Sequence, residues 1–390
     1  MSFLSKSSLF HRILNRKYNF FVKFFFAVIA FSVCLIFSLN LQLSIFISRE
    51  IIFGDDLKND IRKLIWIIKT SIFPISYSID LMFDFCSGLE NKYLDFYKKR
   101  LNFYLKFKNN VFAELDLLKL IAYEIENLKN NDLSKKSILL REFKSQYFQI
   151  KRRLKSNKEE SNNLIKRNKK KIFYKSRGMN IHDAKEVLLD LDHFFSTCNI
   201  TWFVIAGTFL GFIRENSFLK HDLDIDIGIN ENSISVEEFK KYIENFKKFR
   251  IARIEYQRVY INSQENILRP ALFRLVHVNG INVDVFFHFL IKNKIYHGTS
   301  SIIWKNKIFS LSPIYIYGLN INGPKESNEY LKETYGNWKL KKKDYIYHRD
   351  MPSISGAYNH LGLEYLLRCQ FFLGIDKISE ISYLESLLFS

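Results

Sequence analysis

The sequence predicts an α+β domain with a mixed β-sheet in the second half of the chain, and three patterns carry this prediction. Residues 180–199 repeat apolar side chains at helical spacing after a capping residue, Asn180 or Asp183. Residues 200–206 form an apolar run that is typical of a buried strand. Residues 223–227 alternate apolar and acidic side chains, which is the period of a strand. Further strand patterns follow, so helices and strands share one domain.

The first predicted region, residues 1–50, contains a basic segment and a membrane anchor. Residues 24–47 are uncharged and long enough to cross a bilayer, which takes roughly 20 apolar residues. No small-residue cleavage site of a signal peptide follows them. A single transmembrane helix is therefore expected, with a buried core helix as the alternative. Basic residues on both sides give a cytoplasmic N-terminus only a slight preference.

The second predicted region, residues 51–177, is a helical membrane-proximal stalk that ends in a basic linker. Residues 64–85 are apolar but include Lys69, Pro74 and Asp80, so they predict an interfacial or re-entrant piece. Residues 151–177 are densely basic and supply much of the formal net charge of +19. A solvated linker, or attraction to anionic membrane lipid, explains that run better than nucleic acid, because no recognition module accompanies it.

Cysteine usage excludes two further classes of protein. The chain has four cysteines, and none of them forms a Cys-x-x-Cys or a Cys/His cluster. Neither a structural zinc site nor a disulfide framework is expected.

The third predicted region, residues 178–390, contains the acidic strand. Asp224 and Asp226 lie two residues apart, so both side chains point to one face of the strand. Two like charges side by side repel, and a bound cation relieves this repulsion. Carboxylate oxygens suit Mg²⁺ or Mn²⁺, which in turn bind phosphate. The alternative is a solvated acidic face without a ligand.

A third carboxylate strengthens the metal-site interpretation. The dipeptide Asn279-Gly280 separates two strand-like runs and favours a type I′ hairpin. Asp284 lies between Val283 and Val285 on the second of these strands. If this strand lies beside Asp224 and Asp226, the three carboxylates suffice for two divalent ions and phosphoryl transfer.

These motifs together resemble the LicD/fukutin family, a branch of the nucleotidyltransferase superfamily with a polymerase-β-like fold. The resemblance covers roughly residues 181–350 and rests on a Gly-Thr-x-Leu-Gly-x-x-Arg segment, an Asp-x-Asp strand, a later single aspartate and a tyrosine-rich tail. The corresponding residues are Gly207, Thr208, Leu210, Gly211 and Arg214, then Asp224 and Asp226, then Asp284, and finally Tyr330, Leu331, Tyr335 and Gly336. His221 and Leu223 depart from the family pattern, and Leu223 puts only an auxiliary acidic role in doubt.

The resemblance implies transfer of a phospho-substituent from a CDP-linked donor to a sugar hydroxyl of a glycan acceptor. Known donor types of the family are CDP-choline, CDP-ribitol and CDP-glycerol. Asp224 and Asp226 would bind the metal that bridges the donor's pyrophosphate. Asp284 would bind a second metal or take the proton of the acceptor.

Five further residues are predicted to bind substrate. Gly207 and Thr208 would form a tight turn whose N–H groups approach the phosphates. Arg214 would contact a phosphate, or else pair with Glu215 on the surface. Asp222 matches an acidic position of the family, although a turn or cap role is the simpler interpretation. His288 would line the pocket, unless it is packed in the core.

Gly336, in the tyrosine-rich tail, would cap the C-terminus of a helix.

Two other functions stay open from the sequence alone. The same carboxylates serve a nucleotidyltransferase that uses a nucleoside triphosphate, and an inactive membrane scaffold would keep the fold. The expected location is a bacterial inner membrane with the catalytic domain in the cytoplasm. The alternative is a eukaryotic Golgi lumen, where imported donors are available.

Overall fold

The computed structural model describes residues 111–128, 132–156, 178–291, 293–342 and 345–390, with isolated residues before 111. The chain divides into two compact units, residues 1–120 and 121–390. Residues 151–156 of the predicted basic linker form the end of a helix, whereas the rest of the linker, the segment 64–85 and, apart from isolated positions, the predicted anchor at 24–47 lie outside the described residues. The predicted domain boundaries at 50 and 177 do so too, and all of these stay predictions. Within the described part of the chain, no helix is long and apolar enough to span a bilayer.

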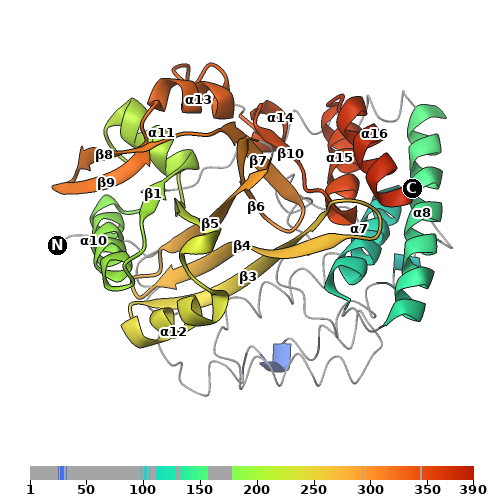
Figure 1. Cartoon of the computed structure of the whole chain (residues 1–390), viewed down its shortest axis with the longest axis horizontal. Helices are drawn as coiled ribbons and strands as arrows, with labels where there is room; N and C mark the ends of the chain where they lie inside the picture. Colours follow the sequence, from blue (N-terminus) through green and yellow to red (C-terminus); the bar gives the residue numbers. More distant parts are fainter. Residues whose placement is uncertain are drawn as a thin grey trace. The chain divides into compact units, whose positions relative to one another are not determined.

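Helices and strands are interleaved along the chain (Figure 1). The helices are α7 (Val111–Asn127), α8 (Leu133–Ser156), α10 (Ile181–Thr197), α11 (Ala206–Glu215), a 3-10 turn η1 (Glu231–Ser233), α12 (Val236–Phe246), α13 (Ser327–Tyr335), α14 (Tyr347–Asp350), α15 (His360–Leu373) and α16 (Ile378–Phe389). The strands are β1 (Trp202–Val204), β2 (Asp224–Asn230), β3 (Phe249–Tyr260), β4 (Asn266–His277), β5 (Asn282–Ile291), β6 (Lys294–Gly298), β7 (Ile302–Lys307), β8 (Leu311–Ile316), β9 (Leu319–Pro324) and β10 (Ile354–Gly356).

Eight of the described strands form one mixed sheet, as the sequence predicted. Its path runs β1-β2-β5-β6-β7-β10, and the β3–β4 hairpin joins at β5. Strand β5 is the centre, because β2 and β4 flank its first part and β6 pairs with its end. The β2–β5 pair is parallel, whereas the other pairs are antiparallel. Strands β8 and β9 form a separate hairpin.

Helices α10 and α12 cover one face of this sheet with aromatic side chains. Phe239 of α12 meets Phe273 of β4 and Phe287 of β5, with ring centroids 5.2 and 5.9 Å apart. Phe194 of α10 lies 5.9 Å from Phe239. Because side chains alternate along a strand, the residues between these apolar positions point to the opposite face. That opposite face carries the charged residues described below.

The beginning of α10 follows the predicted capping pattern. The side chain of Asn180 accepts a hydrogen bond from the N–H of His182 at 2.9 Å, which satisfies a backbone donor that the helix itself leaves unpaired. The predicted inward face is also confirmed, since these side chains are buried: Ala184, Val187, Leu188, Leu191, Phe194 and Phe195.

The predicted tight turn at Gly207 and Thr208 is wrong. Both residues lie in the first turn of α11, directly after β1. The sharp bend comes one residue earlier, at Ala206, whose φ of 47° is in the left-handed region. The chain therefore passes from strand to helix through a strained alanine, and the two predicted turn residues are helical.

The predicted hairpin around Asn279-Gly280 is confirmed, but its type I′ turn is wrong. His277 and Ile281 close the loop through a backbone hydrogen bond of 2.9 Å, so three residues separate them. A type I′ turn needs positive φ at both central residues, whereas Gly280 has φ 95° and Asn279 is not in that region. The longer loop changes the strand register by one residue, and this change shapes the site.

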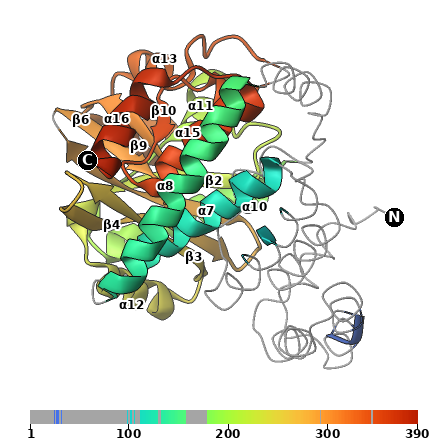
Figure 2. The same ribbon diagram turned by 90° about the vertical axis from the view of Figure 1, so that its right-hand side faces the viewer.

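Residues 121–128 and 132–156 pack on the C-terminal helices rather than standing apart from them. Glu126 accepts hydrogen bonds from the backbone N–H and the ring of His360, at 2.9 and 2.7 Å. Tyr147 of α8 donates to Glu385 of α16 at 2.7 Å. Figure 2 shows α8 beside α15 and α16. This part of the predicted stalk therefore belongs to the same compact unit as the sheet.

Candidate active site

The parallel pair β2–β5 brings three aspartates together. Asp226 is the register partner of Asp284, and Asp224 precedes Asp226 by two residues, so all three share one face of the sheet. One carboxylate oxygen of each lies within 4.8 Å of the others. Asp284 is buried, and Asp224 and Asp226 are partly exposed. The structure thus places all three predicted metal ligands in one cluster, while their metal-binding and catalytic roles stay predictions.

An arginine that the sequence argument missed is bonded to this cluster. Arg274 of β4 is the cross-strand partner of Asp284. Its Nε and Nη2 both donate to the Asp284 carboxylate, the first at 2.6 Å, and Nη2 also reaches Asp224 at 3.3 Å. A guanidinium fork of this kind matches a carboxylate bidentately. Arg274 therefore holds two of the three carboxylates in place.

The strand register explains why Arg274 was missed. A two-residue turn at Asn279-Gly280 would pair Arg274 with Val285 and would send the arginine to the apolar face. The three-residue loop instead pairs Arg274 with Asp284. A shift of one residue in a strand register moves every side chain to the other face. The length of the loop decides the position of Arg274, and the dipeptide Asn279-Gly280 by itself favours the two-residue turn.

Asp222 forms the acidic edge of the site next to α11. Its Oδ2 atom is buried and has no hydrogen-bond partner among the described residues. The same oxygen lies 2.8 Å from where a Cβ atom on Gly207 would be, so the glycine leaves room for the carboxylate. Burial, followed by the charge of Asp224, raises the pKa of Asp222 to about 7.

The pKa of Asp226 is also raised well above its ordinary value. Burial is the largest cause, and the neighbouring charges of Asp224, Asp222 and Asp284 add to it. Arg274 acts in the opposite direction but does not outweigh them. Arg274 is hydrogen-bonded to two of these four carboxylates, Asp284 and Asp224, so negative charges outnumber positive charges among these side chains.

The residues fit a divalent cation. The donors are carboxylate oxygens, which hard cations such as Mg²⁺ and Mn²⁺ prefer. The unpartnered Oδ2 atom of Asp222 and the raised pKa of Asp226 both indicate negative charge that the protein alone does not satisfy. Asp224, Asp226 and Asp284 would hold the ion, and Asp222 lies at its edge.

Thr208 fixes the acidic strand to helix α11. Its side chain is fully buried, and its hydroxyl accepts a hydrogen bond from the N–H of Asp226 at 2.9 Å. This bond sets the backbone of the acidic strand β2 relative to the N-terminus of α11. The predicted contacts of Gly207 and Thr208 with substrate phosphate stay predictions.

Arg214 lies at the far end of α11, where other partners engage its guanidinium. Nη1 donates to the carbonyl of Trp338 at 3.0 Å, and Nη2 donates to Glu215 at 3.2 Å. The structure therefore ties Arg214 to the segment after α13 and does not bond it to the three aspartates. Its predicted phosphate contact stays a prediction.

His288 is packed in the core beyond the aspartates. It is 2% exposed, lies against Phe203 and stacks on His297 with ring centroids 4.4 Å apart. A Cβ atom on Gly228 would come within 2.5 Å of its ring, so this glycine admits the imidazole. Burial lowers the pKa of His288 to about 4, which keeps the ring neutral at physiological pH.

The tyrosine-rich tail forms α13, next to α11. Gly336 caps this helix with φ 68°, as the sequence predicted. Tyr330 packs its ring against Phe209 of α11 at 5.5 Å. Burial is the main cause that raises the pKa of Tyr335, and the charge of Asp226 contributes. The tail therefore supports the wall of the site near Asp226.

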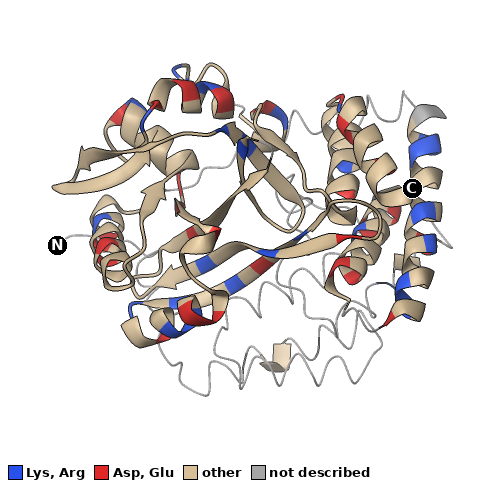
Figure 3. Ribbon diagram, viewed as in Figure 1, with Lys and Arg blue, Asp and Glu red and all other residues tan. Residues whose placement is uncertain are grey.

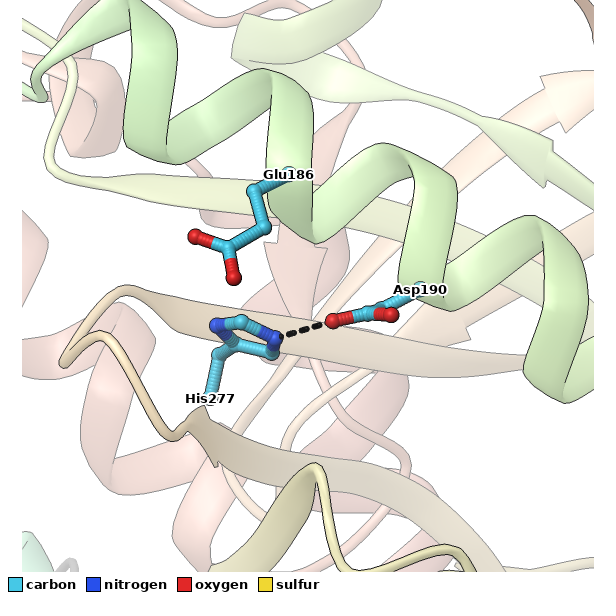
Figure 4. A group of neighbouring side chains, drawn as sticks. All are labelled: Glu186, Asp190 and His277. Atoms are coloured by element: carbon cyan, nitrogen blue, oxygen red, sulfur yellow. Dashed lines mark hydrogen bonds and ion pairs between the residues drawn. The ribbon is translucent and has the colours of Figure 1, made fainter.

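A second group of possible ligand atoms lies away from the three aspartates. Glu186 and Asp190 of α10 face His277 at the end of β4 (Figure 4). His277 Nδ1 accepts from the N–H of Asn279, so its Nε2 carries the proton and donates to Asp190 at 2.8 Å. Asn279 also donates to Glu186 at 3.2 Å. Because these groups satisfy one another, we interpret them as a clip that fastens the β4–β5 loop to α10.

The comparison with protein families agrees with this site. Residues 199–326 match the model described as LicD/FKTN/FKRP, nucleotidyltransferase domain. These residues form a LicD/fukutin-family domain. The LicD/fukutin-family domain contains Gly207, Thr208 and all four clustered aspartates, together with Arg274. The resemblance expected from the sequence motifs is thus confirmed.

The individual proteins that match part of the chain include one from Rickettsia typhi and one of known structure. An uncharacterized protein of Rickettsia typhi, RT0683, is 23% identical over 154 residues, which are 39% of this chain and 45% of that protein. The match thus spans less than half the length of this relative. The crystal structure of lincosamide antibiotic adenylyltransferase LnuA with lincomycin bound is 16% identical, covering 41% of this chain and 90% of that one. Its TM-score of 0.27 is too low to support an argument about fold or activity.

Proposed function

We propose that this protein transfers a phospho-substituent from a CDP-linked donor to a sugar hydroxyl of a surface glycan. The LicD/fukutin-family domain supports a transferase of phosphate groups. The observation that carries the proposal is the cluster of Asp224, Asp226 and Asp284, whose charge the protein leaves partly unneutralised. We also propose a polymerase-β-like fold for this domain, which the parallel acidic strands β2 and β5 and the contact of α11 with β2 support.

In the proposed reaction, an oxygen of the acceptor sugar bonds to the phosphorus that carries the substituent. The bond from this phosphorus to the CMP oxygen breaks, and CMP leaves with the bonding electron pair. A bound Mg²⁺ or Mn²⁺ ion would offset the negative charge on the phosphates. Asp224 and Asp226 would hold this ion, and Asp284 would either hold an ion with them or accept the proton of the hydroxyl.

The location and the partners are part of the proposal. We expect residues 24–47 to anchor the chain in a membrane, with the domain on the cytoplasmic side, where CDP-linked donors are made. A Golgi lumen supplied with imported donors is the alternative. Basic residues in 151–177 would meet anionic lipid headgroups. No nucleic-acid partner is expected.

The test uses the full-length chain, purified in a mild detergent. It is incubated with Mg²⁺, a glycan acceptor and either CDP-choline, CDP-ribitol or CDP-glycerol, and released CMP is measured. CMP from one donor, lost with EDTA and in Asp226→Asn, would establish the reaction and name the transferred group. Asp190→Asn is the matched control, because it makes the same substitution in the second cluster.

A nucleotidyltransferase reaction is the second candidate, because the matching family model is described as a nucleotidyltransferase domain. This reaction would release pyrophosphate from a nucleoside triphosphate and attach the nucleotide to the acceptor. The same incubation with CTP, ATP, GTP and UTP separates the two candidates by product. If a folded protein releases neither CMP nor pyrophosphate with any acceptor, the result would favour an inactive scaffold.

A further inference from the structure

A row of four charged side chains crosses the sheet on the carboxylate face. Register pairs join Asp226 of β2 to Asp284 of β5, Asp284 to Arg274 of β4, and Arg274 to Arg253 of β3. Paired residues on adjacent strands point to the same face. Two acids are therefore followed by two arginines on four neighbouring strands. Figure 3 shows basic residues along β3 and β4.

A β-bulge places Arg253 in this row. The register of the β3–β4 pair shifts between Ile251 and Arg253. Without the shift, Arg253 would pair with Phe273 and would point to the face that α12 covers. A bulge re-aims a side chain in this way and is common beside active sites. The chain thus departs from regular pairing at the position that brings a second guanidinium next to Arg274.

Two arginines directly opposite each other on neighbouring strands repel unless anions lie beside them. Arg274 has Asp284 and Asp224, and Arg253 has Glu255, whose Oε1 atom is 2.9 Å from its Nε. Ser300 in turn donates its N–H and its hydroxyl to Glu255, which fixes that carboxylate. The side chains of Arg274 and Arg253 remain 30% and 21% exposed, so a ligand can reach both.

A divalent ion at the aspartates would change the partners of Arg274. The ion would take the oxygens of Asp284 and Asp224 to which Arg274 is bonded, and two positive groups cannot share them without repulsion. The guanidinium would then lose at least part of its neutralisation, and Arg253 lies next to it. An anion held close to the metal would restore the balance of charge.

We propose that Arg274 and Arg253 form an anion-binding subsite for the donor's phosphates. Arg274 holds the metal-binding carboxylates in place while no ion is bound, and the ion displaces it toward the phosphates. This inference rests on the proposed function, because it takes the anion to be the donor's pyrophosphate. It assigns to Arg274 and Arg253 the phosphate contact that the sequence motif suggested for Arg214.

The first measurement is the Kd of Mn²⁺ alone, on full-length protein in detergent. Arg274→Gln removes a positive charge that competes with the ion, so Mn²⁺ should bind at least about fivefold more tightly than to the wild type. The Kd of Mn²⁺ for Arg253→Gln and for Arg274→Lys should stay within about twofold of the wild-type value. The first variant keeps Arg274 itself, and the second keeps its positive charge. Arg269→Gln is the matched control on the same strand, since Arg269 is bonded to Glu231 at 2.6 Å and stacks on Phe289.

The second measurement is the Kd of CDP for the Mn²⁺-loaded proteins. Arg274→Gln should weaken CDP binding at least about tenfold, and Arg253→Gln about fivefold. The CDP affinity of Arg274→Lys should lie between those of Arg274→Gln and the wild type, because a lysine keeps the charge but not the bidentate fork. Arg269→Gln should bind CDP as the wild type does. A melting curve checks that each variant is folded. If Arg274→Gln does not fold, the two single variants Arg274→Lys and Arg253→Gln are sufficient to test the CDP affinity.

The outcomes separate this inference from the proposed function. Weaker Mn²⁺ binding in Arg274→Gln, or unchanged CDP affinity in all arginine variants, would overturn the subsite, even if the wild type releases CMP. Expected shifts in both Kd values without CMP release from any donor would overturn the proposed reaction and keep the subsite. If neither the wild type nor Arg274→Gln binds Mn²⁺, both are wrong.

Discussion

The described part of the chain contains two groups of possible metal ligands, and they differ in how their polar atoms are satisfied. In each, three ligand atoms lie within 4.8 Å of one another. Glu186, Asp190 and His277 use hydrogen bonds to one another and to the β4–β5 loop. In the aspartate cluster, burial and mutual repulsion raise the pKa of Asp226 well above normal. Proximity alone therefore does not indicate a cation site; unsatisfied charge on a shared face does.

The largest expected difference between the two groups is catalytic. Asp226→Asn should lower CMP release about a hundredfold or more, because it removes a ligand whose charge acts on the reacting phosphate. The rate of CMP release by Asp190→Asn should stay within about threefold of the wild-type rate, because the clip of Glu186, Asp190 and His277 lies outside the site. Rates of CMP release under identical Mg²⁺ and donor concentrations measure both. Equal losses in the two variants would break the distinction.

The second difference is in stabilisation by metal. Mn²⁺ at about 100 times its Kd should raise the free energy of unfolding of the wild type by about 2.7 kcal/mol. Asp226→Asn should lose most of this gain, and Asp190→Asn should keep it. Denaturant unfolding with and without Mn²⁺ measures the gain. A metal effect that survives in Asp226→Asn but disappears in Asp190→Asn would exchange the roles of the two groups.

The third difference is in pH dependence without metal. The folded-state pKa of Asp222 is raised to about 7, above its unfolded value, so ionising it costs stability. The wild type should therefore lose stability as the pH rises from about 4 to about 7. Asp222→Asn should show a smaller loss, because only the raised pKa of Asp226 then remains, and it should be about 2 kcal/mol more stable than the wild type at pH 7.5 in EDTA. Excess Mn²⁺ should cancel that advantage, and parallel pH profiles of the two proteins would contradict the assignment.

The smallest expected effect concerns the clip. Asp190→Ala leaves the buried Nε2–H of His277 without its partner, and a lost bond of this kind costs about 1–2 kcal/mol. The free energy of unfolding should fall by this amount, while the Kd of Mn²⁺ stays within about twofold. Urea unfolding and Mn²⁺ titration of the same preparation test both. A large rise in the Mn²⁺ Kd would make the clip part of the metal site.

The sequence located the parts of the fold that local chemistry decides. Asn180 caps α10 with its own side chain, and the alternation around Asp224 and Asp226 follows from strand geometry. The hairpin around Asn279-Gly280 was also predictable from its residues. These features depend on neighbours within a few positions, so the sequence pattern is sufficient for them.

The rest depends on register and on long-range packing. Arg274 reaches Asp284 because the loop has three residues rather than two, and Arg253 reaches the same face because of a bulge. Neither feature has a strong local signal. Likewise, the polar helical segment before the domain gave no hint of its partners, since Glu126 and His360 are separated by most of the chain. Such contacts follow from tertiary packing rather than from periodicity.

The contacts of residues 121–156 with α15 and α16 have a consequence for how the protein is made. Glu126 binds His360 at the beginning of α15, and Tyr147 and Lys144 bind residues of α16. These partners are synthesised more than 200 residues later. A ribosome that has completed the family domain at residue 326 has not yet made those partners. The earlier helices must remain without them until α15 and α16 have been synthesised, so these contacts form only after residue 389 has emerged. A nascent chain halted before α15 would keep its apolar helix surfaces open to chaperones or to a nearby bilayer.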